Sequence, residues 1–251
     1  MEQTERLAGG NVAEEVLRIG DVVHKPATAA TPAVGALLRH LEVVGCDSAP
    51  RWLGLDGQGR QQLTYVPGQL ADTLPPMTVD ELHRLGTLIR SLHDALAGFR
   101  PPPYAHWDVV IAPDREELVC HHDLAPWNLV RDGDHWVFID WDGAGPGSRL
   151  WDLGYAAHSF VPLHPDGDPE RDGLRLRSLA DGYELSAADR AGLMIAARDH
   201  TRGMYELLVR GAATGLQPWA RLHAEGHAEH WGPAADYIAA HVDTWTRILL
   251  A

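Results

Sequence analysis

Short runs of alternating hydrophobic and polar residues dominate the first third of the chain. The runs "EEVLRIG" and "DVVHKP" meet at Gly20-Asp21, and "RWLGLD" and "RQQLTYV" flank "GQG", so each pair predicts a β-hairpin. Between the hairpins, Thr31-Pro32 predicts a helix start, with Thr31 as N-cap and Pro32 at the first helical position. This helix is expected to end at Gly45 and to bury Val34, Leu37, Leu38 and Leu41.

The spacing of hydrophobic residues becomes helical after the Pro- and Gly-rich connector "VPGQLADTLPPM". Thr78 and Glu81 predict a capping box, with Met77 and Leu82 as its hydrophobic staple. The expected buried face has three- and four-residue spacing and consists of Leu82, Leu85, Ile89, Leu92 and Leu96. A long helix therefore follows the connector.

Further helices are predicted around a short β-rich insert. Between residues 118 and 140, the pieces "LV", "NLV" and "WVFID" predict short strands separated by polar loops. Ser186 and Asp189 predict a second capping box, which opens a helix that runs to about Gly211. A last helical pattern spans roughly residues 233 to 250.

Two lobes are expected from this succession of elements. Residues 1–66 predict a small β-sheet lobe with one helix, and residues 67–251 predict a larger, mainly helical lobe, so the fold class is α+β and bilobal. The chain has 251 residues, 45% of them hydrophobic, which is enough to bury a substantial core.

The charge and the cysteine content limit the possible functions. A formal net charge of −14 argues against a nucleic-acid partner, which needs a basic surface. The same charge is compatible with a cationic small substrate, although acidity also serves solubility. No apolar run reaches the about 18 residues of a membrane span, and "MEQTERLAGGN" lacks a signal-peptide pattern. With only Cys46 and Cys120 and no disulfide framework, we expect a cytoplasmic protein without membrane association.

The stretch "CHHDLAPWN" carries the clearest chemical signal. It spaces His121, Asp123 and Asn128 on a polar loop, and Asp140 follows at the end of the hydrophobic strand "VFID". An aspartate on such a loop can accept the proton of a substrate hydroxyl and orient its oxygen. Asn128 and Asp140 can supply the hard oxygen ligands that Mg²⁺ prefers. The spacing predicts phosphoryl transfer, with Asp123 as catalytic base and Asn128 and Asp140 as metal ligands.

These residues resemble the catalytic loop and metal aspartate of the protein-kinase-like fold. The variant "HxDLxPxN…IDW…G…xDLG" resembles the aminoglycoside phosphotransferase and choline kinase family in particular. The resemblance implies Mg²⁺ as cofactor, ATP or GTP as phosphate donor, and a hydroxyl of a small molecule as acceptor. It favours an aminoglycoside-like antibiotic, while choline, sugars, amino alcohols and macrolides are the other acceptors of the family. The oligomeric state is left open.

The resemblance also implies which residues contact the nucleotide. "LAGGN" resembles the turn that covers the phosphates, and "LTYVPG" resembles the hinge that holds the base. Lys25 resembles the lysine of the third strand that pairs with the phosphates. The nucleotide contacts expected from these similarities are Gly9, Gly10, Asn11, Lys25, Tyr65 and Val66.

The chain departs from the family pattern on its first helix. In the family, the lysine pairs with a helix glutamate, but this chain has Val34, Gly35 and Ala36 at the corresponding place. The nearest acidic residue is Glu42, at the far end of the helix. This departure motivates a second hypothesis, a kinase-fold protein that binds nucleotide without turnover.

Several polar residues near the loop have more than one interpretation. His121 and Asp152 are expected to support the catalytic loop structurally, whereas a metal-dependent hydrolase would use the histidines as ligands. Asp142 would lie on the opposite face from Asp140 if the strand continues, where it could face the substrate or cap a turn. Trp127 could line the substrate cleft or simply pack.

A second histidine cluster occurs in "HAEGHAEHW". Its spacing would place His223, His227 and His230 on one helical face. Metal binding, a solvated face and a wall of the substrate pocket are all open here.

Overall fold

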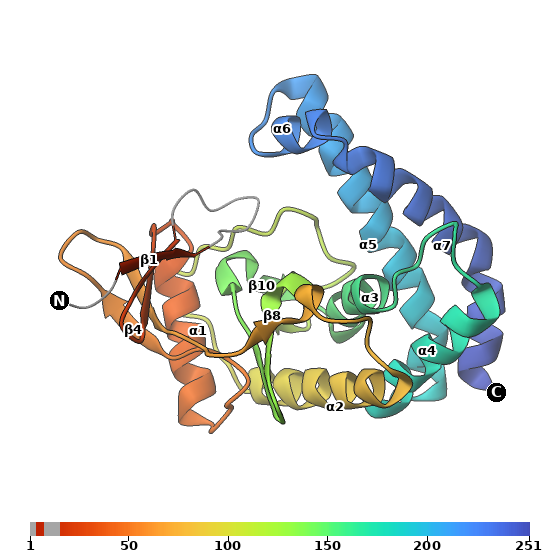
Figure 1. Cartoon of the computed structure of the whole chain (residues 1–251), viewed down its shortest axis with the longest axis horizontal. Coiled ribbons are helices and arrows are strands. Elements are labelled where there is room, and N and C mark those ends of the chain that lie inside the picture. The colour runs from red at the N-terminus through yellow and green to blue at the C-terminus, as the bar shows by residue number, and fades with distance from the viewer. Residues whose placement is uncertain (1–3, 8–15) are drawn as a thin grey trace.

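The computed structural model describes residues 4–7 and 16–251 of the chain, which form two lobes (Figure 1). The turn predicted to cover the phosphates, with Gly9, Gly10 and Asn11, lies outside the described residues. The predicted α+β, bilobal architecture is confirmed, with an antiparallel sheet in the small lobe and mainly helices in the large one. No helix in the described part of the chain is long and apolar enough to cross a membrane.

The small lobe is a five-stranded antiparallel sheet with the order β1-β2-β3-β5-β4. Its strands are β1 (Thr4–Leu7), β2 (Val16–Ile19), β3 (Val22–Lys25), β4 (Trp52–Leu55) and β5 (Gln61–Thr64). Both predicted hairpins are present, β2-β3 and β4-β5. The edge strand β1 was not predicted, because "TERL" has a single apolar residue and therefore shows no alternation.

Helix α1 (Thr31–Val43) packs beside this sheet and buries the predicted face of Val34, Leu37, Leu38 and Leu41. The predicted cap was wrong by one residue. Ala30 is the N-cap and makes no side-chain cap, while the hydroxyl of Thr31 accepts a hydrogen bond from the backbone N–H of Thr28 at 2.8 Å. The Thr31 side chain thus orders the turn before the helix instead of closing its first turn.

The connector leads through β6 (Gln69–Leu70) and the short 3₁₀ helix η1 (Ala71–Thr73) into α2 (Val79–Leu96). The predicted capping box is present. The Thr78 hydroxyl accepts from the Glu81 N–H at 3.2 Å, and a Glu81 oxygen accepts from the Thr78 N–H at 2.8 Å. The five predicted core residues of α2 are each at most 1% exposed. Their burial places one face of α2 in the hydrophobic core of the large lobe.

Two small sheets carry the polar loops between α2 and the remaining helices. Strand β8 (Leu129–Asp132) lies between β6 and β9 (His135–Phe138), and β7 (Leu118–Cys120) pairs with β10 (Gly145–Gly147). The 3₁₀ helix η2 (Pro126–Asn128) lies between β7 and β8, and the 3₁₀ helix η3 (Trp141–Gly143) lies between β9 and β10. The strands predicted from "LV", "NLV" and "WVFID" are therefore present.

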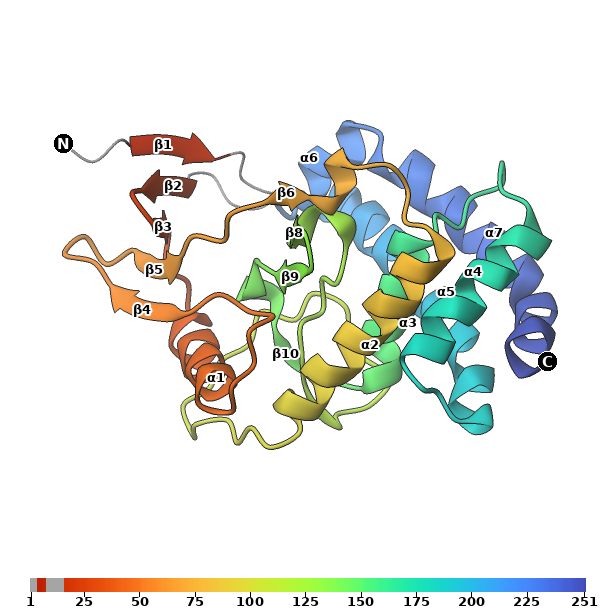
Figure 2. The same ribbon diagram turned by 60° about the horizontal axis from the view of Figure 1, so that its bottom comes forward.

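Five further helices complete the large lobe, of which α4, α5 and α7 lie at the end away from the small sheet, with α4 packed on α2 (Figure 2). They are α3 (Arg149–Phe160), α4 (Pro169–Gly182), α5 (Ala187–Thr214), α6 (Trp219–Ala224) and α7 (His227–Leu250). Helix α5 starts as predicted, because the Ser186 hydroxyl accepts from the N–H of Asp189. It ends three residues beyond the predicted Gly211, where Gly215 takes a left-handed conformation with φ 72°.

One hydrophobic cluster runs through both lobes. It contains Leu37 and Leu41 of α1, the buried face of α2, Phe138 of β9 and Trp245 of α7. The lobes also share a backbone hydrogen bond from the N–H of Phe138 to the carbonyl of Ser48 at 3.0 Å. The lobes therefore meet along a common core as well as through the linker between β5 and β6.

Candidate active site

The catalytic loop predicted from "CHHDLAPWN" is attached to α3 through one buried carboxylate. Asp152 accepts hydrogen bonds from the backbone N–H groups of His121 at 3.0 Å and of His122 at 2.8 Å. Asp152 is fully buried. His122 adopts a left-handed backbone with φ 65°, which is uncommon for a residue other than glycine. The two charge-assisted hydrogen bonds that Asp152 accepts hold the loop in this shape.

A histidine of α2 completes the environment of this carboxylate. The Nε2 of His93 lies 3.1 Å from Asp152, and its Nδ1 lies 2.8 Å from the Tyr183 hydroxyl. Burial opposes ionisation of Asp152, but the hydrogen bond from His93 and the neighbouring histidines lower the pKa of its carboxyl to about 2. His93 was not singled out from the sequence. Its only signal was its place in "LHDAL", beside the hydrophobic face of α2.

The side chains of the two loop histidines point at backbone carbonyls. The Nε2 of His121 lies 3.0 Å from the carbonyl of Ile139, and the Nε2 of His122 lies 3.1 and 3.0 Å from the carbonyls of Gly145 and Pro146. The His121 ring also packs on Trp141, and burial lowers its pKa. The histidines therefore support the loop and are not aimed at a common metal ion.

Asp123 projects from this loop and is half-buried among polar side chains. The side-chain amide of Asn128 donates to its carboxylate at 2.7 Å and to its carbonyl at 3.0 Å. The Tyr155 hydroxyl and the Trp127 side chain lie beside the carboxylate and favour its charged form. Burial and the charge of Asp140 raise the pKa of Asp123 to about 6, although these three side chains oppose the shift. Tyr155 was missed, yet it lies one helical turn after Asp152 in "DLGY", where both side chains face the loop.

Asp140 directly follows Ile139, the residue opposite Asn128 in the register of the β8-β9 hairpin. Leu129 is paired with Phe138, and the N–H of Ile139 donates to the carbonyl of Asn128 at 2.8 Å. Asp140 itself has a left-handed backbone with φ 61°. The hairpin thus carries an amide and a carboxylate at neighbouring positions.

Lys25 of β3 crosses from the small lobe to this hairpin. Its Nζ lies 2.6 Å from an oxygen of Asp140 and 2.8 Å from an oxygen of Asp142. Burial opposes the charge of Lys25, but the two carboxylates outweigh it and raise its pKa, so the ammonium is charged. Lys25 in turn lowers the pKa of Asp140.

The alternative that placed Asp142 on the opposite face from Asp140 was wrong. Residues two apart in a strand share a face, so the alternation did not support that expectation. Strand β9 ends at Phe138, and after the following turn of 3₁₀ helix both carboxylates lie beside Lys25. The side-chain N–H group of Gln61 donates to both Asp142 oxygens, at 3.2 and 3.3 Å. No sequence pattern singled out Gln61, because its role depends on its register opposite Lys25 in the sheet.

Asn128 and Asp140 fit a magnesium ion by the chemistry of their donors. Both offer hard oxygen atoms, and the β8-β9 pairing holds them at neighbouring positions. Asn128 uses its amide nitrogen for Asp123, so its carbonyl oxygen is the atom it would offer to a cation. The donor set is therefore suitable for Mg²⁺.

The residues predicted to hold the nucleotide base lie in the linker between the lobes. Tyr65 donates its backbone N–H to the carbonyl of Asp21 at 2.8 Å, and the Arg18 guanidinium lies 3.6 Å from the centre of the Tyr65 ring. Val66 follows and is partly exposed. Gly68 has φ 135°, and a Cβ atom there would lie 2.6 Å from the carbonyl oxygen of Arg131. The structure thus places Tyr65 and Val66 where the chain passes between the lobes.

The hypothesis that His223, His227 and His230 share a helical face was wrong. Gly226, with φ 90°, separates α6 from α7, so that His223 lies on one helix and the other two lie on the next. The His230 ring stacks instead on His164, with centroids 5.6 Å apart.

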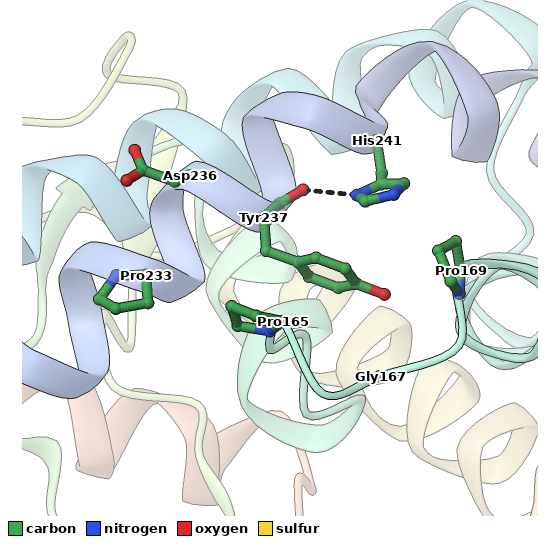
Figure 3. A pocket seen from close by; sticks show the side chains of 7 residues that line it. All are labelled: Pro165, Gly167, Pro169, Pro233, Asp236, Tyr237 and His241. Atoms are coloured by element: carbon green, nitrogen blue, oxygen red, sulfur yellow. Dashed lines mark hydrogen bonds between the residues drawn. The ribbon is translucent and has the colours of Figure 1, made fainter.

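Two cavities lie away from the catalytic loop. One of about 540 Å³ opens between the loop before α4 and helix α7, where the Tyr237 ring points between Pro165 and Pro169 (Figure 3). The other, of about 630 Å³, lies between residues 109–113 and α5. Neither is lined by Lys25, Asp123 or Asp140.

Comparison with known proteins defines the family. Residues 5–194 match the sequence model of the phosphotransferase enzyme family (APH). The chain belongs to this family. It is therefore a phosphotransferase that acts on a hydroxyl group. The predicted family resemblance is confirmed by this match.

Relatives of this phosphotransferase include a protein of known biological role. This chain is 34% identical over 193 residues to the trifolitoxin immunity protein of Rhizobium leguminosarum bv. trifolii. The match covers 71% of this chain and 74% of that protein. An amicoumacin kinase solved in complex with AMP-PNP, Ca²⁺ and Ami has a TM-score of 0.69 at 14% identity, covering 96% of this chain and 88% of that chain. A choline/ethanolamine kinase family protein from Mesorhizobium loti has a TM-score of 0.64 at 16% identity, with coverages of 98% and 92%. These structures share the kinase-like fold.

Proposed function

We propose that this phosphotransferase is a Mg²⁺-dependent small-molecule kinase. It transfers the γ-phosphate of ATP or GTP to a hydroxyl of a small cationic acceptor, of which an aminoglycoside-like antibiotic is the leading candidate. The observation that carries this proposal is the arrangement of Lys25, Asp123, Asn128 and Asp140 around one site.

Each residue has a definite task in this reaction. Asp123 accepts a hydrogen bond from the acceptor hydroxyl, orients its oxygen and takes its proton. Asn128 and Asp140 hold Mg²⁺, which neutralises charge on the phosphates when it is bound. Lys25 pairs with the nucleotide phosphates, and Tyr65 and Val66 contact the base. Gly9, Gly10 and Asn11 are proposed to cover the phosphates, as expected from the resemblance.

The scaffold around Asp123 supports a role for it as base. Asn128 donates a hydrogen bond to its carboxylate, and Tyr155 and Trp127 lie beside it, so its orientation is restricted before an acceptor arrives. A preoriented carboxylate loses little freedom on reaching the transition state. Asp152 and His121 contribute by holding the loop that carries it.

A cationic acceptor is supported by the surface beside Asp123. Trp127 is 42% exposed and lies beside the carboxylate, so part of the indole faces solvent next to the base. An indole face attracts an ammonium group by about 0.5–2 kcal/mol. The net charge of −14 acts in the same direction over longer distances.

The relatives favour antibiotic or toxin chemistry among the possible acceptors. One protects against trifolitoxin by its name, and one acts on amicoumacin. A choline, sugar or amino-alcohol kinase is the second candidate, because a choline/ethanolamine kinase family protein shares the fold. The proposed location of the reaction is the cytoplasm, because it contains nucleotide and Mg²⁺ and keeps thiols such as Cys46 and Cys120 reduced.

A nucleotide-consumption screen over cationic antibiotics, sugars and amino alcohols tests the proposal. We expect one acceptor class to stimulate release of ADP or GDP in the presence of Mg²⁺, with Asp123→Asn as the inactive control. In parallel, Mg-nucleotide at 100-fold over Kd should stabilise the protein by about 2.7 kcal/mol. If neither ATP nor GTP raises the melting temperature, the kinase hypothesis fails. If nucleotide binds but no acceptor is phosphorylated, binding without turnover becomes the better description.

A further inference from the structure

Helix α1 provides no carboxylate for Lys25. Its first turn contains no acidic residue, and Glu42 is exposed in its last turn. At Gly35, an added Cβ atom would lie 2.8 Å from the Trp52 ring of β4. A longer side chain cannot fit there unless Trp52 moves. The part of α1 where the family carries its glutamate is closed by packing.

The turn after β9 supplies the missing charge from the other lobe. Asp142 lies 2.8 Å from the Lys25 Nζ, and it is held in turn by Gln61. Gln61 is fully buried and also donates to the carbonyl of Pro26 at 3.0 Å. Because Gln61 is paired with Lys25 in the β3-β5 register, one strand pair positions both the ammonium and the amide that orients its partner.

The two carboxylates around Lys25 are not equivalent. Asp140 follows Ile139, which pairs with Asn128 on the β8-β9 hairpin, and it belongs to the proposed metal ligands. A carboxylate engaged with a divalent cation has less negative charge to share with an ammonium. Asp142 is held instead by the side-chain amide of Gln61. It can therefore keep Lys25 in place when Asp140 is engaged.

We propose that Asp142, oriented by Gln61, is the positioning residue that anchors Lys25 for the nucleotide phosphates, in place of a helix glutamate. This inference rests on the proposed function, since it concerns the same nucleotide site. It assigns the anchor to the large lobe, so the lysine and its partner come from opposite sides of the site.

A double-mutant cycle on nucleotide affinity tests this assignment without an acceptor. The Kd for Mg²⁺ with AMP-PNP or GMP-PNP, whichever binds the unsubstituted protein, is measured by calorimetry for Asp142→Asn, Lys25→Met and the double variant. Loss of one charge-assisted contact should weaken binding about tenfold in Asp142→Asn. In the Lys25→Met background, the same substitution should change the Kd less than twofold, because its target is gone.

Matched variants distinguish an anchor for Lys25 from a general effect of removing negative charge. Glu42→Gln tests the remaining acid of α1, and Asp132→Asn makes the same charge change at an exposed site on β8. Both should leave the Kd within twofold. If Asp142→Asn does not fold, Gln61→Met provides a second route, and about a threefold weakening that disappears in the Lys25→Met background is expected.

Three results would overturn the inference. The first is an unchanged Kd in Asp142→Asn while the unsubstituted protein binds nucleotide. The second is that Asp142→Asn weakens nucleotide binding equally with Lys25 and in the Lys25→Met background, and also raises the Mg²⁺ concentration needed for binding. That result would make Asp142 a metal ligand. The third is a loss in Glu42→Gln. Absence of nucleotide binding to the unsubstituted protein would instead reject the proposed function.

Discussion

The catalytic loop and the carboxylates around Lys25 adjoin the same site, yet they are held by different interactions. The loop depends on hydrogen bonds to the fully buried Asp152, all within the large lobe. The Lys25 cluster depends on ion pairs between lobes, and the Asp140 and Asp142 side chains are 37% and 31% exposed. The loop is therefore a fixed scaffold, whereas the charged cluster can exchange partners when ligands bind. Substitutions in and around the loop test this difference.

The largest effect is expected for the chemistry itself. Asp123→Asn should lower kcat by about 10²–10⁴-fold, because a general base contributes this much. The loop around it should remain folded, so the melting temperature and nucleotide Kd should stay close to those of the unsubstituted protein. Steady-state kinetics on an acceptor found by screening would check this. Full activity in Asp123→Asn would remove Asp123 from the role of base.

The scaffold side of the contrast is tested by Asp152→Asn. This substitution removes the charge that binds two loop N–H groups and His93, and we expect it to lower the free energy of unfolding by about 3 kcal/mol. Asp94→Asn is a suitable control, because Asp94 makes partly exposed ion pairs with Arg90 and Arg149. Its loss should be below about 1 kcal/mol. Equal losses in urea unfolding would contradict the special role of Asp152.

Buried histidines behind the loop should make the protein sensitive to mild acid. Burial lowers the pKa of His158 and of His200 to about 3, below the ordinary value of 6.5. Since the folded-state pKa is depressed, their stabilising effect is complete above about pH 6.5 and is lost progressively as the pH falls toward 3. At pH 5, each of the two histidines should lower the free energy of unfolding by about 2 kcal/mol relative to its value above pH 6.5.

Urea unfolding at pH 7 and pH 5 checks this pH dependence. His158→Phe should reduce the difference between the two pH values by about 2 kcal/mol, because one of the two groups no longer titrates. The exposed His106 offers a matched control, and His106→Phe should leave the difference unchanged. An undiminished acid loss in His158→Phe would mean that other groups cause it.

The smallest effect is expected at a site outside both regions. Thr78→Ala removes the capping box of α2 and should lower the free energy of unfolding by about 1 kcal/mol. Nucleotide affinity should not change, because the cap contacts neither the loop nor Lys25. A loss of nucleotide affinity in Thr78→Ala would show that global stability limits binding. Weaker nucleotide binding by variants of Lys25 and its partners would then no longer report on local contacts.

Local patterns in the sequence predicted much of the fold. The two hairpins, the capping box of α2, the Ser186 N-cap of α5 and the buried face of α2 all arise from interactions within a few residues, which spacing alone can reveal. The reciprocal bond of the capping box predicted for α5 is not made, because the Asp189 carboxylate accepts from the Ser186 hydroxyl. The edge strand β1 and the break at Gly226 were missed for the opposite reason. Strand β1 is stabilised by pairing with β2, and the helical spacing of the histidines carried no information about the glycine conformation.

The residues of the candidate site divide in the same way. Asp123, Asn128 and Asp140 stand in one recognisable spacing and come together on one loop and hairpin. Their metal and catalytic roles remain predictions. Gln61, His93 and Tyr155 reach the site from a strand and two helices that are distant in sequence. Only the tertiary packing brings these side chains into contact, so the spacing of the loop alone could not identify them, although "LHDAL" and "DLGY" contain two of them.

The hydrophobic cluster shared by the lobes has a consequence for how the protein opens and unfolds. Leu37 and Leu41 of the small lobe pack in the same core as α2 and α7, so separating the lobes would expose apolar surface to water. A wide hinge motion is therefore costly, and nucleotide should enter with only small adjustments of the lobes. For the same reason, heat or urea should unfold both lobes in a single cooperative transition. A fragment that stops at Val66 should then fail to fold by itself, although it carries the whole small sheet.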